Sequence, residues 1–189
     1  MIWKETFASV GVILDDQSHC ETMGFRVDEI VAHWHSKFPW NQPSRQEVTN
    51  ALVDRLCSLV TEKGESLPGV EETMHFFVKE NIPIAIASSS TVKIIEAVMK
   101  RLAIDKYLST IVSAEHEEYG KPHPGVFITA AKKLSVSPRN CLTFEDSANG
   151  IIAAKAAKMQ CVAVPSLEVR NDPRIAIADF VIDSLEDLH

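Results

Sequence analysis

Short apolar runs that alternate with helical stretches constrain the fold of this chain more than any other feature. They begin after Leu67-Pro68-Gly69, are bounded by turn residues, and lie at 83–87 (PIAIA), 110–113 (TIVS), 141–144 (CLTF), 161–164 (CVAV) and 180–182 (FVI). Helical stretches lie between them near 92–102, 125–134 and 149–157. Short apolar strands separated by helices are typical of a parallel sheet covered on both faces. The pattern predicts a doubly wound α/β domain.

The residues before Leu67 have a helical pattern instead. Apolar residues recur there three and four positions apart, at Ile30, Val31 and Trp34, and then at Val48, Leu52 and Leu56. Ser44 and Glu47 fit a capping box, which predicts a helix beginning at Arg45. We therefore expect a helical domain over residues 1–66 and the α/β domain over residues 67–189.

Composition and charge narrow the range of partners. The chain has 189 residues, is 46% hydrophobic and carries a net charge of −7, so it can build a core but offers no broad cationic surface for nucleic acid or membrane. No apolar run approaches the roughly 20 residues of a membrane span, and the first residues lack a signal-peptide layout. We expect a cytoplasmic monomer in which any anionic ligand meets a local cationic site.

Hydroxyl side chains follow the first predicted strand, at the sheet edge where such folds bind ligands. Ser88, Ser89 and Ser90 come directly after the run at 83–87. Ser90 or Thr91 could cap the following helix, which would account for one hydroxyl. Three hydroxyls beside helix amides also make a phosphate cradle.

A lysine lies in the loop after the second predicted strand. Lys121 stands between Gly120 and Pro122, which restrict its backbone and aim its ammonium. A solvated loop lysine is the alternative, but a fixed point charge suits a phosphoryl oxygen. His123, in the same loop, is expected to be a packing or solvated residue.

Two carboxylates, Glu145 and Asp146, follow the third predicted strand. Asp146 or Ser147 could cap the next helix. Adjacent carboxylates at a buried strand end would repel each other unless a cation lies between them, and oxygen ligands beside a phosphate site suit Mg²⁺.

Hydroxyl, lysine and acid pair, each after a strand, resemble three motifs of the haloacid dehalogenase superfamily. The segments SSST, KPHPGVF and FEDSANGIIAAKAAKM look like its β-phosphoglucomutase-like branch, and PWNQPSRQEV, LPGV and VRNDPRIAIAD look like bacterial hexitol and 2-deoxyglucose-6-phosphate phosphatases. The resemblance implies that Ser88 and the amide of Ser89 bind the phosphoryl group. It also implies that Lys121 neutralises its charge and orients the nucleophile, and that Glu145 and Asp146 hold Mg²⁺.

The same resemblance implies a substrate and a role for the helical half. The helical half would be a cap over a phosphorylated sugar or polyol, and Arg26, in the segment TMGFR, is the candidate to touch substrate. An exposed cap arginine is the alternative. The implied activity is Mg²⁺-dependent hydrolysis of sugar or hexitol phosphates; a β-phosphoglucomutase-type isomerase and a noncatalytic binder of phosphorylated ligands are the alternatives.

One family motif is missing from the sequence. The Asp-x-Asp-Gly that carries the nucleophile and its acid/base partner should precede Ile2-Trp3-Lys4-Glu5, where only Met1 stands, and Asp15 and Asp16 lie on the wrong side of Trp3. We expect the runs at 83–87 and 141–144 to have bare ladder edges, because the missing strand would lie between them. We also expect no activity from these residues alone. Two explanations fit the missing motif: Met1 is an internal methionine of a longer enzyme, or the chain is naturally short. We favour the first.

Overall fold

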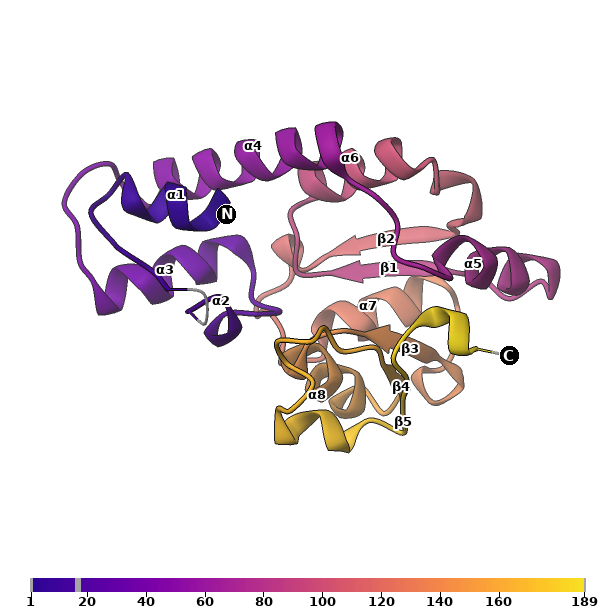
Figure 1. Cartoon of the computed structure of the whole chain (residues 1–189). Helices are drawn as coiled ribbons and strands as arrows, with labels where there is room; N and C mark the ends of the chain where they lie inside the picture. Colours follow the sequence, from indigo (N-terminus) through magenta and orange to yellow (C-terminus); the bar gives the residue numbers. More distant parts are fainter. Residues whose placement is uncertain (1, 16–17, 189) are drawn as a thin grey trace.

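The computed structural model describes residues 2–15 and 18–188, and its first third is helical (Figure 1). The helices there are α1 (Ile2–Ala8), α2 (Ser18–Glu21), α3 (Val27–Lys37) and α4 (Arg45–Lys63). The predicted start of α4 is confirmed: Ser44 Oγ accepts a hydrogen bond from the Glu47 amide at 3.3 Å, and Glu47 Oε2 accepts one from the Ser44 amide at 2.8 Å. Asp15 accepts a hydrogen bond from the Ser18 amide at the start of α2, and Asp16 lies outside the described residues.

The remainder alternates helices with short parallel strands, as predicted. The helices are α5 (Val70–Lys79), α6 (Val92–Leu102), α7 (Gly125–Lys133) and α8 (Ala148–Ala156), and the strands are β1 (Ala85–Ser88), β2 (Thr110–Ser113), β3 (Leu142–Glu145), β4 (Gln160–Ala163) and β5 (Phe180–Val181). Short 3-10 helices lie at Asp105–Tyr107, Ala114–His116, Pro138–Asn140, Pro173–Ile177 and Leu185–Asp187. The α/β fold class is confirmed.

The strands form two parallel sheets rather than one. β1 pairs with β2, and β3, β4 and β5 pair in that order. Within the described residues, β1 and β3 therefore each have one ladder edge without a partner strand, as the family resemblance implied. In the register of the ladders, Ser88 pairs with Ser113 and Glu145 with Ala163, so the predicted site residues lie at carboxyl ends.

One apolar core connects the two sheets. α7 lies between them in Figure 1 and packs on β1, β2 and α8. Small side chains make this close packing possible: Ala130, Ala131, Ala153 and Ala154 are all buried in it, and Ala85 and Ala87 of β1 pack against it. The two sheets thus share a core without sharing a hydrogen-bonded ladder.

A second core lies in the helical half around Phe7, Val31, Trp34 and Leu52, and it also includes Ile94 of α6. α4 packs along α6, as Figure 1 shows at the top of the molecule. The two halves therefore meet through α6, and a domain division near Leu67 stays a prediction.

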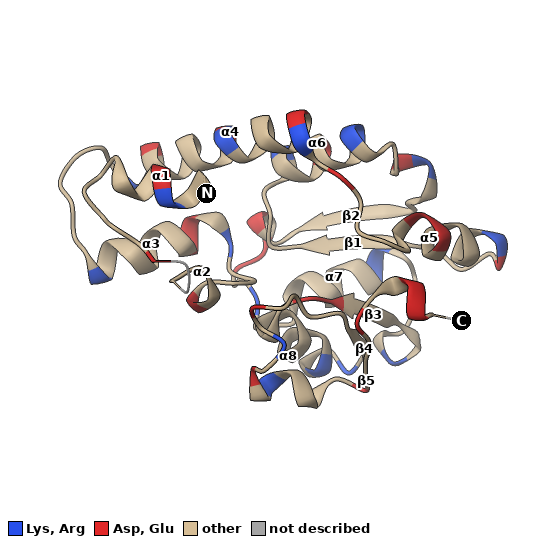
Figure 2. Cartoon of the chain, in the orientation of Figure 1, with Lys and Arg blue, Asp and Glu red and all other residues tan. Residues whose placement is uncertain are grey.

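Charge and cysteine placement agree with a globular protein. Figure 2 shows Lys and Arg interspersed with Asp and Glu along α4. Among the described residues, no helix is both long and apolar enough to cross a membrane. The four cysteines are free; Cys161 is buried, whereas Cys20, Cys57 and Cys141 are half-buried.

Candidate active site

Lys121 joins the carboxyl ends of β1 and β3. Its side chain is only 6% exposed, and Nζ donates to the Ala87 carbonyl at 3.2 Å and to Oε1 of Glu145. Nζ also lies 4.6 Å from the centre of the Phe127 ring. An ammonium has three N–H donors, and these two acceptors use two of them. The burial of Lys121 contradicts the solvated-loop alternative.

The carboxylate of Glu145 is as buried as the ammonium it contacts. Its side chain is 8% exposed, and Oε2 accepts a hydrogen bond from the Ser147 hydroxyl at 3.2 Å. A Cβ at position 150 would overlap this carboxylate, so Gly150 leaves the space it occupies. Burial raises the pKa of the Glu145 carboxyl, and the Lys121 ammonium acts in the opposite direction. The Lys121 ammonium therefore offsets part of the charge on the Glu145 carboxylate, and a Mg²⁺ beside it stays a prediction.

The hydroxyls after β1 do not cap α6, although capping was the alternative that the sequence left open. Thr91 stands at the N-cap position without a side-chain capping bond, and Glu115 Oε2 accepts the Val92 amide instead, at 3.0 Å. Ser88 Oγ accepts a hydrogen bond from the Ser90 amide at 3.1 Å. Because that bond uses Ser88 as an acceptor, its O–H can still donate to a ligand such as a phosphoryl oxygen.

Ser147 rather than Asp146 caps α8, since Ser147 Oγ accepts the Gly150 amide at 3.1 Å. Asp146 is exposed at the carboxyl end of β3. Its oxygens are the hard ligands that Mg²⁺ prefers, and Mg²⁺ is often held by one or two carboxylates with water in the other positions. No group of three or more His, Cys, Asp or Glu side chains suited to a metal occurs in residues 2–15 and 18–188. A Mg²⁺ site at Glu145 and Asp146 stays a prediction.

Arg26 and Ser89 connect the helical half to this edge of the sheet. Arg26 Nη1 donates to the Glu117 carbonyl at 3.0 Å, and Nη2 forms an ion pair with Asp28 at 2.7 Å. The Ser89 hydroxyl donates to the Gly24 carbonyl at 2.7 Å. Contact of Arg26 with substrate stays a prediction, and the side chain is 17% exposed rather than lying free on the surface.

His123 packs within its own loop, as expected. Its Nδ1 accepts the Gly125 amide at 3.2 Å, and its ring lies 5.3 Å from that of Tyr119. Glu29 and Asn149 are neighbours of the site that the sequence analysis missed. Glu29 stands three residues after Arg26, which is capping-box spacing, but no sequence signal reveals its contact with the loop before Lys121.

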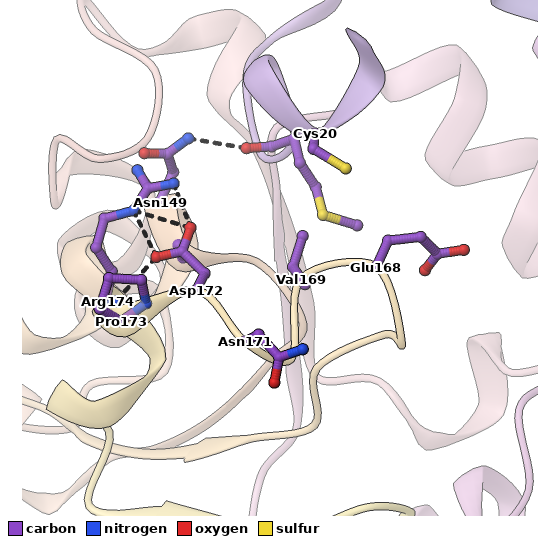
Figure 3. Close-up of a pocket in the computed structure, with 10 residues that line it drawn as sticks. Cys20, Asn149, Glu168, Val169, Asn171, Asp172, Pro173 and Arg174 are labelled. Carbon is purple, nitrogen blue, oxygen red and sulfur yellow. Dashed lines mark hydrogen bonds and ion pairs between the residues drawn. The ribbon is translucent and has the colours of Figure 1, made fainter. Parts of the chain in front are cut away.

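A cavity of about 470 Å³ adjoins the amino end of α8 (Figure 3). Its walls come from the helical half, from α8 and from the loop after β4: Cys20, Met23, Ala148, Asn149, Glu168, Val169, Asn171, Asp172, Pro173 and Arg174. The Arg174 guanidinium contacts Asp172 through Nε and Nη2 at 2.6 to 3.1 Å. Apart from this ion pair, the polar groups of the lining include the amides of Asn149 and Asn171 and the carboxylate of Glu168.

The model of the haloacid dehalogenase-like hydrolase family matches residues 2–164. The chain belongs to this family. Hexitol phosphatase B of Escherichia coli K12 is 39% identical over 185 residues, which span 97% of this chain and 83% of that protein. By this relationship the chain is a phosphoric monoester hydrolase of the β-phosphoglucomutase-like branch.

Two solved structures have the same fold. CbbY from Rhodobacter sphaeroides, in complex with phosphate, superposes with a TM-score of 0.89 at 24% identity, over 99% of this chain and 87% of that one. β-Phosphoglucomutase from Clostridium difficile gives 0.83 at 26% identity, over 100% of this chain and 84% of that one. Haloacid dehalogenase-like hydrolases generally use Mg²⁺, which agrees with the donor set of Glu145 and Asp146.

Proposed function

We propose that this chain carries the phosphoryl-binding site of a Mg²⁺-dependent phosphatase for sugar or hexitol monophosphates, such as 2-deoxyglucose 6-phosphate. One observation carries the proposal: the Lys121 ammonium links the strand end that bears Ser88 to the strand end that bears Glu145 and Asp146. Three groups suited to a phosphate ester thus share one edge of the sheets. The similarity to hexitol phosphatase B supports the substrate class.

Each residue has a distinct part in the proposed reaction. The Ser88 hydroxyl and the Ser89 amide donate to oxygens of the phosphoryl group, while Lys121 offsets its negative charge with its remaining N–H. Asp146 and Glu145 hold Mg²⁺, which when bound supplies further charge neutralisation. The family resemblance assigns the nucleophile, which forms an aspartyl-phosphate, and the leaving-group acid to an Asp-x-Asp-Gly motif. Preorganised charge of this kind stabilises the transition state without forming a bond itself.

The cavity of Figure 3 suits the hydroxyl-bearing part of such a substrate. The amides of Asn149 and Asn171 both donate and accept hydrogen bonds, as polyol hydroxyls do. Glu168 adds a carboxylate that would repel a second phosphate or a sugar acid. We therefore propose monophosphates of uncharged sugars or polyols as substrates, in preference to bisphosphates.

The experiment uses a chain extended at its amino end by an apolar strand ending in Asp-x-Asp-Gly, assayed with Mg²⁺ against sugar monophosphates, hexitol monophosphates and bisphosphates. We expect phosphate release from the monophosphates. Lys121→Ala is expected to lower kcat by roughly 100-fold, because removing one preorganised charge from an active site typically costs about that factor in rate. Interconversion of glucose phosphates without phosphate release would favour the isomerase instead. Phosphate binding without any turnover would favour the noncatalytic binder.

Mg²⁺ is expected to stabilise the extended chain and scarcely to affect the chain of these 189 residues. Two carboxylates bind Mg²⁺ weakly, whereas a third ligand from the added strand would tighten the site. At about 100 times its Kd, a ligand adds about 2.7 kcal/mol to stability. Thermal melts of both chains, with Mg²⁺ and with a chelator, measure the difference.

Asp146→Asn in the extended chain should remove that Mg²⁺ response. Asp105→Asn is the matched control, since Asp105 is also exposed but precedes β2 and so lies at the other end of the strands. A response that survives Asp146→Asn would show that this carboxylate is no metal ligand.

A further inference from the structure

The short segment from Met23 to Glu29, which runs into α3, contacts the loops after β1 and β2 and the first turn of α8 together. The Ser89 hydroxyl donates to the Gly24 carbonyl at 2.7 Å, and Asn149 Nδ2 donates to the Met23 carbonyl at 2.8 Å. These two bonds attach the segment to the loop after β1 and to the first turn of α8. The loop after β2, from Ala114 to Lys121, is held by side chains.

Arg26 and Glu29 supply those side chains. Arg26 Nη1 donates to the carbonyls of Glu117 at 3.0 Å and Ala114 at 3.4 Å. Glu29 Oε1 accepts a hydrogen bond from the Gly120 amide at 3.2 Å, and Glu29 Oε2 accepts one from the Arg26 amide at 3.0 Å. One carboxylate thus begins α3 and also fixes the residue directly before Lys121.

Two glycines permit these close approaches. A Cβ at Gly120 would overlap the Glu29 carboxylate, and a Cβ at Gly24, where φ is +84°, would lie 2.7 Å from Ser147 Oγ. Any larger residue at position 120 would displace the Glu29 carboxylate from its place beside the Gly120 amide. The contact therefore depends on glycine at both places.

The two sheets share no ladder within the described residues, so the position of Lys121 between β1 and β3 depends on what holds its loop. We propose that Glu29, assisted by Arg26, is a positioning residue that sets Lys121 in its contact with Ala87 and Glu145. The site would then be assembled only while the helical half is docked. This inference rests on the proposed function for its catalytic meaning, but not for its geometry.

Glu29→Ala and Glu29→Gln test the inference in the chain of these 189 residues. We expect the Gly120 amide, followed by NMR hydrogen exchange, to exchange at least about tenfold faster in Glu29→Ala, because its acceptor is lost. The ¹⁵N signal of Lys121 Nζ should shift or disappear, although Lys121 is not itself changed. Glu29→Gln keeps one carbonyl acceptor at the same length and should restore part of both signals.

Glu47→Ala is the matched control. Glu47 closes a capping box at the start of α4, as Glu29 does at α3, but its hydrogen bonds go to Ser44 within the helical half. Glu47→Ala should leave both readouts unchanged. Equal changes in Glu47→Ala, or none in Glu29→Ala, would overturn the inference. If Glu29→Ala fails to fold, Glu29→Gln and Arg26→Met are compared with Glu47→Ala by the same readouts.

Neither readout involves phosphate, so this test and the test of function can fail separately. If Lys121→Ala abolishes turnover in the extended chain while Glu29→Ala leaves the Lys121 signal intact, the proposed function stands and the positioning role falls. If the extended chain has no turnover but the Gly120 and Lys121 signals of Glu29→Ala change as expected, the positioning role of Glu29 stands and the proposed function falls.

Discussion

A polypeptide of these 189 residues is expected to release no phosphate above background from any sugar or hexitol phosphate. The sequence contains no Asp-x-Asp-Gly, and the groups that remain at the strand ends bind charge without attacking phosphorus. Removal of a covalent nucleophile has cost another hydrolase about 10⁶-fold in kcat. Adding a strand that carries this motif should therefore change the rate by several orders of magnitude.

The assay compares the 189-residue chain, the extended chain and an extended chain with both motif aspartates replaced by asparagine. That last variant has the same length and strand, so it separates the effect of the carboxylates from any gain in folding. Turnover by the 189-residue chain that persists after removal of contaminating phosphatases, and that Lys121→Ala abolishes, would contradict the prediction and require a different nucleophile.

Lys121→Met is expected to lower the free energy of unfolding by about 3–5 kcal/mol at neutral pH. Both members of the Lys121–Glu145 pair are buried, and removing one partner leaves an uncompensated buried charge. Burial already raises the pKa of Glu145, and loss of the ammonium would raise that pKa further. Because a raised pKa favours the folded state only while the carboxyl is protonated, the deficit should be larger at pH 8 than at pH 5. Denaturant unfolding in chelator at both pH values measures it.

Two further variants check the cause. Lys121→Met combined with Glu145→Gln should recover much of the lost stability, because no charge is then buried. Lys93→Met removes a lysine from an ion pair with Asp54 whose side chains are 63% exposed, and exposed pairs contribute little. If Lys121→Met loses the same unfolding free energy at both pH values, and Glu145→Gln does not restore it, the loss comes from packing against Phe127 instead.

Local patterns predicted the five strands and the helices α6, α7 and α8 to within two residues. The run TIVS is β2 as predicted, and the capping box of Ser44 and Glu47 begins α4 at Arg45. These features are local, because a capping bond spans three residues and a buried strand reveals itself by its own apolar run. The bare edges of β1 and β3 were also predicted, but only from the family resemblance.

Roles that depend on distant residues could not be predicted in this way. The sequence left open whether Ser90 or Thr91 caps α6, whereas in the structure a carboxylate from the loop after β2, that of Glu115, accepts the amide of Val92 at the start of α6. It gave no sign that a lysine 24 positions away would contact the Glu145 carboxylate, and a metal beside that carboxylate stays a prediction. The spacing of residues along a chain does not indicate which charges meet across two strand ends.

By itself, the sequence determined the alternation of strands and helices, the family, and the order of hydroxyl, lysine and carboxylates at the strand ends. Only the tertiary structure decided that Lys121 is buried against Glu145 and that Glu29 and Arg26 of the helical half hold its loop. The physical reason is range. Hydrophobic periodicity and helix capping depend on residues within one helix or strand. The Lys121–Glu145 ion pair and the hydrogen bonds of Glu29 and Arg26 to the loop before Lys121 form only after separate elements have packed together.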